Sequence, residues 1–460
     1  MLTFALGVLK RRIRSVHTDH RRIAKGAVIV SVFVFLGKGA GAFKEMAVAY
    51  RYGIGGTVDA YQLALTLVSW LPLTVIGELS ILLVPLFVAM RDKKEEMAQF
   101  LAEIEGVCML LGVVLTSLLL LSWPLLAHFT ASNLSESTRT MCLYLLMGLA
   151  PVGVLSFTVC ITAARLQARE KHINTLLESV PALVLLCLVL VVPRRDSLLP
   201  LMLGTSLGVA VQALLLRLCA RNVDGQTARP RLSFRSPHWR KTLHSVSVLM
   251  VGGVIVSMIT PVDQYFLAQV GDGAIATYGY AYRVLTLLIG IGALAISRAI
   301  LPILSEMLAA KDATRARNTA LKWSLVMLAI GALGAPIAYA LAPWMVELLF
   351  QRGAFTADDA RAVTLVFRTG LIQIPFAFAG FVVIQLFVSE ARYRALTFIA
   401  VVSFVVKAGG NVLLAPLYGA QGVMLATGLM TAACFVCYLV FLKQPSGQPR
   451  AIAPHGASEE

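Results

Sequence analysis

Residues 36–61 read LGKGAGAFKEMAVAYRYGIGGTVDAY, and this glycine-rich stretch stands where hydropathy requires the first membrane span. It nevertheless contains five charged residues, namely Lys38, Lys44, Glu45, Arg51 and Asp59. A charged side chain costs roughly 2.5–3.5 kcal/mol at the centre of an inserted helix. Ionisable groups at such a depth normally face a bundle interior or a water-filled cavity. The stretch therefore predicts a helix that forms one wall of a polar pathway across a membrane.

The composition around this stretch is that of a polytopic membrane protein. Of the 460 residues, 58% are hydrophobic and 14% are charged, and the mean hydropathy is +0.80. Because a span takes about 20 apolar residues, division at charged clusters and turns predicts an all-α integral membrane protein with about twelve transmembrane helices. The expected spans are residues 26–50, 58–90, 101–127, 140–164, 174–193, 198–219, 242–268, 275–307, 322–350, 361–388, 395–415 and 420–442.

The net charge of +16 is distributed over alternate predicted loops. The positive-inside rule therefore predicts that both termini are cytoplasmic and that the number of spans is even. Arg194, Arg195 and Arg352 are exceptions on the opposite side. Topology and attraction to anionic lipids explain the excess charge, so nucleic acid is not an expected partner. No cleavable signal segment is expected, because the apolar residues 1–9 precede the basic cluster.

The predicted spans divide into two lobes of six helices. We expect a basic cytoplasmic arm (1–25), an N-lobe (26–219), a cytoplasmic linker (220–241), a C-lobe (242–443) and a disordered cytoplasmic tail (444–460). The two halves match with an offset of 217 residues, since Tyr278 aligns with Tyr61 and Pro302 with Pro85. Such a match indicates duplication. With an even number of spans in each half, the lobes would be related by a pseudo-twofold axis along the membrane normal, with a central cleft between them.

Four basic residues are candidates for binding an anionic headgroup. Lys44 and Arg51 are seven residues apart and share a helix face, while Lys38 is rotated by about a third of a turn and lies roughly 9 Å along the axis from Lys44. Two cationic stripes of this kind suit a multivalent anion such as a pyrophosphate. Arg283 follows Tyr280-Ala-Tyr, and a guanidinium binds phosphate in a bidentate manner. The alternative for Lys44 and Arg51 is snorkelling to the interface.

Other polar residues within apolar segments are candidates for lining the cavity or for coupling. Asp59 is a candidate N-cap of the second span and a candidate for a role in transport, and the two roles are compatible. Asp263 is a candidate counter-charge for Arg283 or a cation site. The remaining members of this group are Glu78, Arg298, Arg368, Lys407 and Asn411.

No constellation typical of an enzyme is present in the sequence. His17 and His20 are the only histidines close enough to share a metal, and no third ligand is near them. A phosphate-binding glycine loop followed by Lys-Ser or Lys-Thr is also absent. We therefore expect a transporter without catalytic residues, metal site or cofactor.

Several motifs resemble the MurJ (MviN) family of bacterial lipid II flippases, which belongs to the multidrug/oligosaccharidyl-lipid/polysaccharide exporter superfamily. The similar segments are residues 37–61, LVPLF at 83–87, YAYR at 280–283 with ILPILS at 300–305, and LFQRGAFT at 349–356. The resemblance implies a V-shaped, two-lobed MurJ/MATE-like transporter in the bacterial inner membrane. It also implies that Lys38 and Lys44 replace essential arginines of the first helix, and that Asp59 and Arg283 match functional residues.

The chain departs from the family pattern at several points. Leu71-Pro72-Leu73 replaces a pair of arginines in the second span, and Gly77-Glu78 replaces a Glu-Gly step. Family members usually have fourteen spans, whereas about twelve are expected here.

The resemblance implies a flippase that moves an undecaprenyl-pyrophosphate-linked saccharide from the inner to the outer leaflet by alternating access. The saccharide would be a lipid II-type peptidoglycan precursor or an exopolysaccharide repeat unit. The energy source would be the membrane potential or a coupling monovalent cation, and the partners would be membrane lipids and the envelope polysaccharide synthesis machinery. A MATE-type drug/cation antiporter, a polytopic glycosyltransferase or polymerase, and a non-transporting scaffold remain alternatives.

Overall fold

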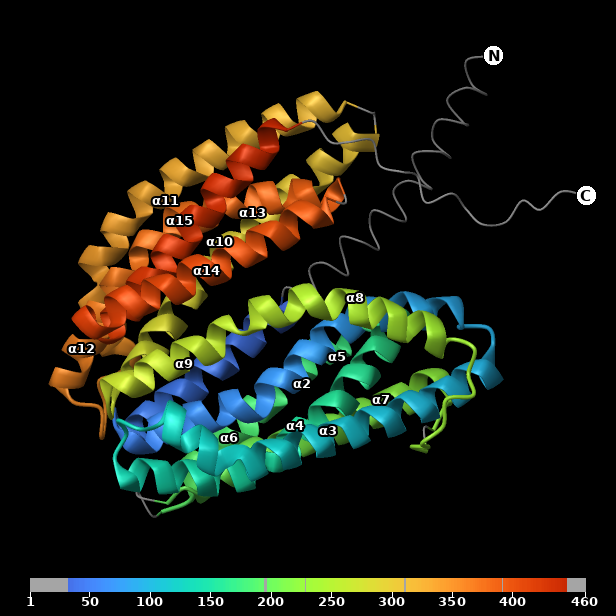
Figure 1. Ribbon diagram of the computed structural model, residues 1–460, viewed down its shortest axis with the longest axis horizontal. Helices are drawn as coiled ribbons and strands as arrows, with labels where there is room; N and C mark the ends of the chain where they lie inside the picture. Colours follow the sequence, from blue (N-terminus) through green and yellow to red (C-terminus); the bar gives the residue numbers. More distant parts are fainter. Residues whose placement is uncertain (1–31, 194–196, 228, 310–311, 391, 445–460) are drawn as a thin grey trace, which may run out of the picture. The chain divides into compact units, whose positions relative to one another are not determined.

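The structure is a computed structural model that describes residues 32–444 except 194–196, 228, 310–311 and 391. Every regular element in these residues is a helix (Figure 1), which confirms the all-α prediction. The described residues form two compact units, each considered separately below. The expected arm at 1–25 and all but the first residue of the expected tail lie outside the described residues.

The first unit contains residues up to Gly253 together with the short segment Arg352–Phe355, whereas Thr130–Leu134 belongs to the second unit. Its first helix is described from residue 32 to residue 52. The others are α2 (Gly56–Ala89), α3 (Lys94–Thr130), α4 (Glu136–Ala168), α5 (Ile173–Leu177), α6 (Val180–Val191), α7 (Leu199–Asp224) and most of α8 (Trp239–Ser257).

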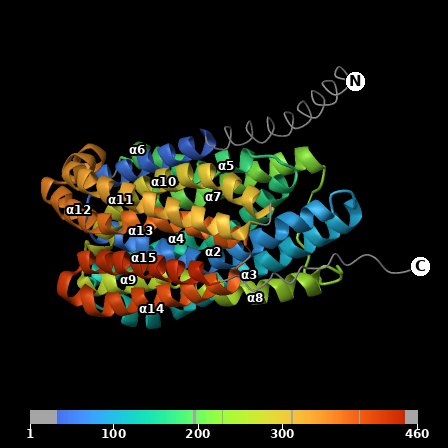
Figure 2. The same cartoon turned by 90° about the horizontal axis from the view of Figure 1, so that it is seen from above.

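The second unit begins at Val254 and includes the end of α8. Its remaining elements are α9 (Ile259–Val270), α10 (Ala274–Ala309), α11 (Ala313–Phe350), α12 (Ala357–Gly370), the 3-10 turn η1 (Leu371–Gln373), α13 (Ile374–Ser389), α14 (Tyr393–Tyr418) and α15 (Ala420–Lys443). α14 and α15 pack side by side in both views (Figures 1 and 2). The helix lengths support the duplication, because α2 and α10 have 34 and 36 residues and α3 and α11 have 37 and 38.

Three of the expected spans, 174–193, 242–268 and 361–388, are each broken into two helices. The breaks follow Leu177, Ser257 and Gly370, and a proline stands four or five residues after each break, at Pro181, Pro261 and Pro375. A proline removes one backbone donor and crowds the carbonyl of the residue four positions earlier. The same residue type is accommodated inside the continuous helices α2 and α4, at Pro72 and Pro151.

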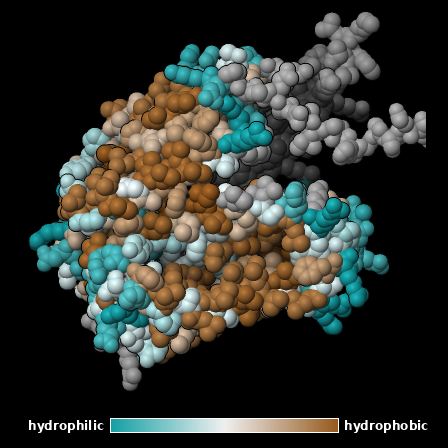
Figure 3. Space-filling view, in the orientation of Figure 1, coloured by the Kyte–Doolittle hydropathy of each residue, from teal (hydrophilic) through white to brown (hydrophobic). Residues whose placement is uncertain are grey.

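Nine helices of the described residues are long and apolar enough to span a membrane. Each of the twelve expected spans overlaps one helix or one broken pair, but the count of twelve spans stays a prediction. Large apolar side chains are exposed on these helices, such as Leu121 (79% exposed) on α3 and Leu333 (73%) on α11. Figure 3 shows hydrophobic side chains over much of the visible surface, with hydrophilic ones gathered toward helix ends. This surface is suited to contact with lipid.

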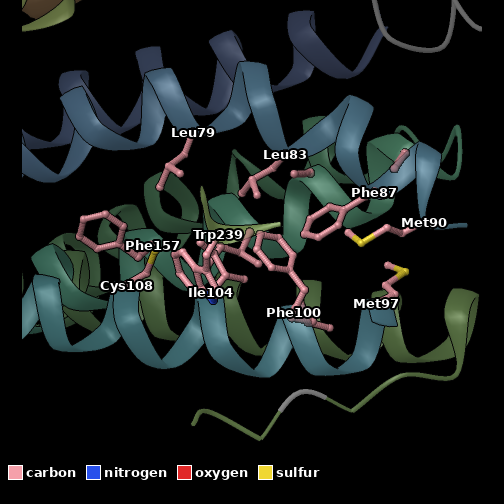
Figure 4. Close-up of a cluster of buried hydrophobic side chains, with 14 residues drawn as sticks. Leu79, Leu83, Phe87, Met90, Met97, Phe100, Ile104, Cys108, Phe157 and Trp239 are labelled. Atoms are coloured by element: carbon pink, nitrogen blue, oxygen red, sulfur yellow. The ribbon is translucent and has the colours of Figure 1, made fainter. Parts of the chain in front are cut away.

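Each unit has its own hydrophobic core. In the first unit the side chains of Leu83 and Phe87 from α2 face Phe100 from α3, and Phe157 and Trp239 complete the cluster (Figure 4). In the second unit the core brings together side chains from α10, α11, α13, α14 and α15; its buried members include Ile296, Leu304, Ala320, Val383, Phe387, Ile399 and Leu442.

The structure also describes most of the residues in the expected linker, 220–241. α7 extends to Asp224 and ends at Gly225, whose φ of 71° is in the left-handed region that glycine adopts without strain. α8 begins at Trp239. The segment between them has no helix or strand among its described residues, and it is hydrogen-bonded to α3.

Candidate functional site

The helix of residues 32–52 positions three of the four predicted anion-binding residues. Ala47, Val48 and Ala49, near the end of this helix, are buried. Lys38 is exposed on this helix and has no hydrogen bond or ion pair to any residue that the structure describes. Lys44 is half-buried and forms an ion pair with the buried carboxylate of Glu45. Lys38 is therefore the cation of this helix that is best placed to meet an external anion.

The third cation, Arg51, is held within the first unit. Its Nη1 donates to the backbone oxygens of Val189 (2.8 Å) and Val192 (2.6 Å), and the guanidinium lies 5.3 Å from the centre of the Tyr52 ring. Backbone oxygens at the end of a helix lack partners within the helix. Arg51 satisfies those at the end of α6 and offsets the negative end of its dipole. This geometry favours a structural role over either snorkelling or substrate binding.

The acidic candidates of the first unit lie on α2. Asp59 is fully buried in the first turn, and Gly55 rather than Asp59 occupies the N-cap position. The interpretation that Asp59 caps the second span is therefore wrong, although a carboxylate in the first turn still interacts favourably with the helix dipole. Glu78 lies against Gly253 of α8, where an added Cβ would be 3.0 Å from its carboxyl carbon. The Glu78 side chain is thus in close contact with α8.

The second unit brings Asp263, Lys407 and Asn411 together in one buried network. Lys407 is 1% exposed and Asn411 is fully buried. The Nζ of Lys407 is 2.9 Å from Oδ1 of Asp263, and it also donates to the backbone oxygen of Val423 (2.7 Å) and to Oγ1 of Thr427 (2.6 Å). Three acceptors satisfy all three donors of an ammonium group.

The carboxylate of Asp263 has further donors. Asn411 Nδ2 donates to Oδ1 at 2.7 Å, and the Tyr278 hydroxyl donates to Oδ2 at 3.3 Å. The Tyr278 ring is stacked on that of Tyr282, with centroids 5.7 Å apart. The network links α9, α10, α14 and α15. It carries one positive and one negative charge, so the burial cost of each is offset by its partner.

Two other basic candidates of the second unit, Arg283 and Arg368, lie on α10 and α12. Asp263, a candidate counter-charge for Arg283 or a cation site, forms its ion pair with Lys407. Arg283 is half-buried on α10. Arg368 stacks on the Tyr339 ring at 4.4 Å and donates to the Tyr339 backbone oxygen at 3.1 Å, which ties α12 to α11. The side chain of Arg298 lies outside the described part of the chain.

Several interacting residues were not among the sequence candidates. Thr427 is one of many small polar residues in apolar segments, and no local pattern distinguishes it. Arg165 and Asp224 form an ion pair at 2.9 Å in which both side chains are 2% exposed. Glu105 pairs with Arg217 at 2.8 Å. Each pair joins residues far apart in sequence; the available signals were Glu105 within the expected span 101–127 and Arg165 directly after the span 140–164. No group of three or more potential metal ligands occurs in the residues that the structure covers.

Two of the conspicuous sequence segments meet in the first unit. The backbone nitrogen of Ala354, in the QRGAFT segment, donates to the backbone oxygen of Tyr50 at 2.8 Å. Gly53 ends the first helix with a φ of 60°, and a Cβ there would be 3.1 Å from the carbonyl carbon of Ala354. Glycine is thus required at position 53 for both its conformation and the close approach.

Comparison with known protein sequences identifies the family of this chain. Residues 48–453 match the sequence model of the family described as lipid II flippase MurJ. A probable lipid II flippase MurJ of Bdellovibrio bacteriovorus is 25% identical over 225 residues, which are 48% of this chain and 42% of the relative. A probable lipid II flippase MurJ of Synechocystis sp. is 26% identical over 369 residues, 75% of this chain and 67% of the relative. The chain thus matches less than half the length of the first relative.

Solved structures share the fold. A lipid II flippase MurJ in an inward closed conformation superposes with a TM-score of 0.79 at 19% identity, covering 91% of this chain and 88% of that one. An inward-facing multidrug resistance MATE family transporter of the MOP superfamily gives a TM-score of 0.67 at 14% identity, covering 90% and 96%. These matches confirm the predicted MurJ/MATE-like fold class.

Proposed function

This chain belongs to the lipid II flippase MurJ family, and on that premise we propose that it moves a lipid-linked saccharide across the bacterial inner membrane. The substrate is an undecaprenyl-pyrophosphate-linked saccharide, either a lipid II-type peptidoglycan precursor or an exopolysaccharide repeat unit. The observation that carries the proposal is the family match over residues 48–453, which include all of the proposed site residues except Lys38 and Lys44. Both termini are cytoplasmic in this proposal, and the envelope polysaccharide synthesis machinery supplies and uses the substrate.

The headgroup is captured by electrostatic attraction. Lys38 is exposed, and Lys44 is half-buried beside Glu45. Together with Arg283 they attract the pyrophosphate, while the prenyl chain stays in the lipid. Lysine provides a point charge rather than the planar fork of arginine, so the first helix attracts the diphosphate without fixing its orientation. Arg51 supports the helix by binding α6 rather than the substrate.

Alternating access then releases the headgroup on the outer side. The membrane potential contributes about 2.3 kcal/mol per charge per 100 mV to the expulsion of an anion when the inside is negative. If both phosphate charges cross most of the field without compensation, the potential drives the cycle without ATP; a coupling monovalent cation is the alternative energy source. The buried network of Asp263, Lys407 and Asn411 is the proposed coupling element of the second unit, because a change in either charge would disturb four helices.

Native mass spectrometry of the detergent-purified protein tests the proposed substrate. The expected result is a co-purified polyprenyl-pyrophosphate saccharide, whose mass names the glycan and distinguishes lipid II from an exopolysaccharide unit. The Lys38→Ala/Arg283→Ala variant should lose this lipid, whereas an Arg361→Ala control on the exposed surface of α12 should keep it. A bound drug-like cation in place of the lipid would contradict the proposal and favour an antiporter.

A further inference from the structure

A basic pocket in the first unit has no part in the proposed transport cycle. It has a volume of about 1080 Å³ and lies between the first turns of α3 and the segment that joins α7 to α8. Three arginines line it, Arg229, Arg231 and Arg235, together with the carboxylate of Glu103. The pocket lies within one unit and involves none of the candidate transport residues.

The joining segment is fixed at its end by Glu103. This buried carboxylate accepts hydrogen bonds from the backbone nitrogens of Arg235 (3.2 Å) and Ser236 (3.1 Å) and from Nε1 of Trp239 (2.6 Å). The Trp239 ring packs against Phe100 of α3, with centroids 5.6 Å apart. Gln99 Nε2 also donates to the Glu103 carboxylate at 3.3 Å, so four donors fix this group, and its single negative charge still leaves the three arginines of the pocket in excess.

Two further contacts fix the middle and the start of the segment. The backbone nitrogen of Arg231 donates to the backbone oxygen of Ala102 at 2.9 Å, and a Cβ at Gly106 would be 2.6 Å from the carbonyl carbon of Arg231. At the start, Arg165 binds the side chain of Asp224 and the backbone oxygen of Gln226 (3.0 Å). Hydrogen bonds and close packing therefore hold the segment that forms the pocket wall in place.

The charge of the pocket is unbalanced. The guanidinium groups of Arg229, Arg231 and Arg235 are exposed, and none of them has a hydrogen bond or ion pair to another described residue. Guanidinium groups match the geometry of phosphate oxygens and bind them in a bidentate manner. The ligand that complements this pocket is accordingly an anion with phosphate oxygens.

The depth of the pocket points to a lipid as the source of that phosphate. α3 has 37 residues, so it is about 55 Å long, whereas the hydrocarbon core is about 30 Å thick. The Lys and Glu residues of α3 all precede Gly106, and the mainly apolar part of the helix follows it. The pocket thus lies at headgroup level. Beside the arginines, Leu232 and Phe234 are 66% and 62% exposed, as suits side chains that contact acyl chains.

We propose that this pocket binds the headgroup of an anionic phospholipid, with Arg229, Arg231 and Arg235 on the phosphate and with Leu232 and Phe234 against the acyl chains. The bound lipid would anchor the segment between α7 and α8 to the membrane surface. This proposal is independent of the molecule that the protein transports, because the two sets of residues do not overlap.

The test titrates the full-length protein in neutral detergent with phosphatidylglycerol or phosphatidylcholine and counts bound lipids by native mass spectrometry. An arginine near an anionic surface strengthens binding by roughly fivefold. The Arg229→Gln/Arg231→Gln/Arg235→Gln variant should therefore lose affinity for phosphatidylglycerol on the order of a hundredfold. The matched control, Arg91→Gln/Lys94→Gln/Lys171→Gln, removes three exposed charges that do not line the pocket. It should stay within about fivefold of the wild type.

A second pair of measurements separates a lipid from a soluble phosphate. Leu232→Ser/Phe234→Ser should weaken phosphatidylglycerol binding, and inorganic pyrophosphate should not displace the lipid. The three arginines, Leu232 and Phe234 are all exposed, so the Tm of each pocket variant should be close to that of the wild type. The proposal is overturned if the wild type does not prefer phosphatidylglycerol to phosphatidylcholine, or if the control variant loses as much affinity as the pocket variant. Displacement of the lipid by pyrophosphate would assign the pocket to a soluble anion instead.

Discussion

The substitution Lys407→Met tests whether the buried ammonium group holds the second unit together. Methionine keeps an unbranched side chain of similar length but removes the charge that lies 2.9 Å from Asp263 Oδ1. Asp263 is 7% exposed, so its carboxylate would be left buried without a counter-charge. Removal of one partner of a buried ion pair costs about 3–5 kcal/mol. We expect a loss of this size in the free energy of unfolding.

The loss should be visible in thermal unfolding followed by tryptophan fluorescence in detergent. For a unit of 150–250 residues, 1 kcal/mol corresponds to about 2–4 °C in Tm, so Lys407→Met should melt about 6–20 °C below the wild type. Lys322→Met, at an exposed lysine of α11, is the matched control and should change little.

A double variant separates the ion pair from the packing of the lysine side chain. Asp263→Asn/Lys407→Met has no unpaired charge, and replacement of both members of a buried pair is often close to neutral. It should therefore recover most of the lost stability. The reasoning is refuted if Lys407→Met melts within about 2 °C of the wild type, or if the double variant is as unstable as the sum of the two single variants.

Two further predictions concern the first unit. Arg51→Met should destabilise it by about 1.5–3 kcal/mol, because two backbone oxygens of α6 lose a charged donor; an unchanged Tm would exclude the capping role. Gly106→Ala should cost about 1–3 kcal/mol, because the new methyl group would collide with the Arg231 backbone, and it should expose the segment between α7 and α8 to trypsin. Gly39→Ala, where no atom lies within 4 Å of the added carbon, is the control; equal proteolysis of the two variants would contradict the prediction.

Hydropathy and charge predicted the helical segments, because lipid imposes the same requirement on every span: apolar side chains and internally satisfied backbone groups. The helix breaks were less predictable. Pro181 and Pro261 follow breaks, yet Pro72 and Pro151 lie inside continuous helices. A proline always removes a backbone hydrogen bond. Whether neighbouring helices compensate for that loss depends on packing that the local sequence does not contain.

The individual polar residues of the site were predictable from the sequence, but the pairs that they form were not. Lys407 and Asn411 stood out because a lysine and an amide one turn apart in an apolar segment must both face polar partners. Asp263, however, lies 148 residues from Asn411, and only tertiary structure selects Lys407 over Arg283 as its partner. Arg51 shared a helix face with Lys44 in sequence, but the neighbouring end of α6 determined what it binds.

Translocation of a lipid-linked saccharide in proteoliposomes tests the central claim most directly. The assay measures how fast the headgroup of an undecaprenyl-pyrophosphate saccharide becomes accessible to a membrane-impermeant lectin, with and without an imposed potential. We predict faster exposure than in empty vesicles, acceleration by a potential that expels anions, and loss of activity in Lys38→Ala/Arg283→Ala but not in the exposed control Lys94→Ala/Arg361→Ala. A rate equal to that of empty vesicles, or a double variant as active as the wild type, would contradict the account.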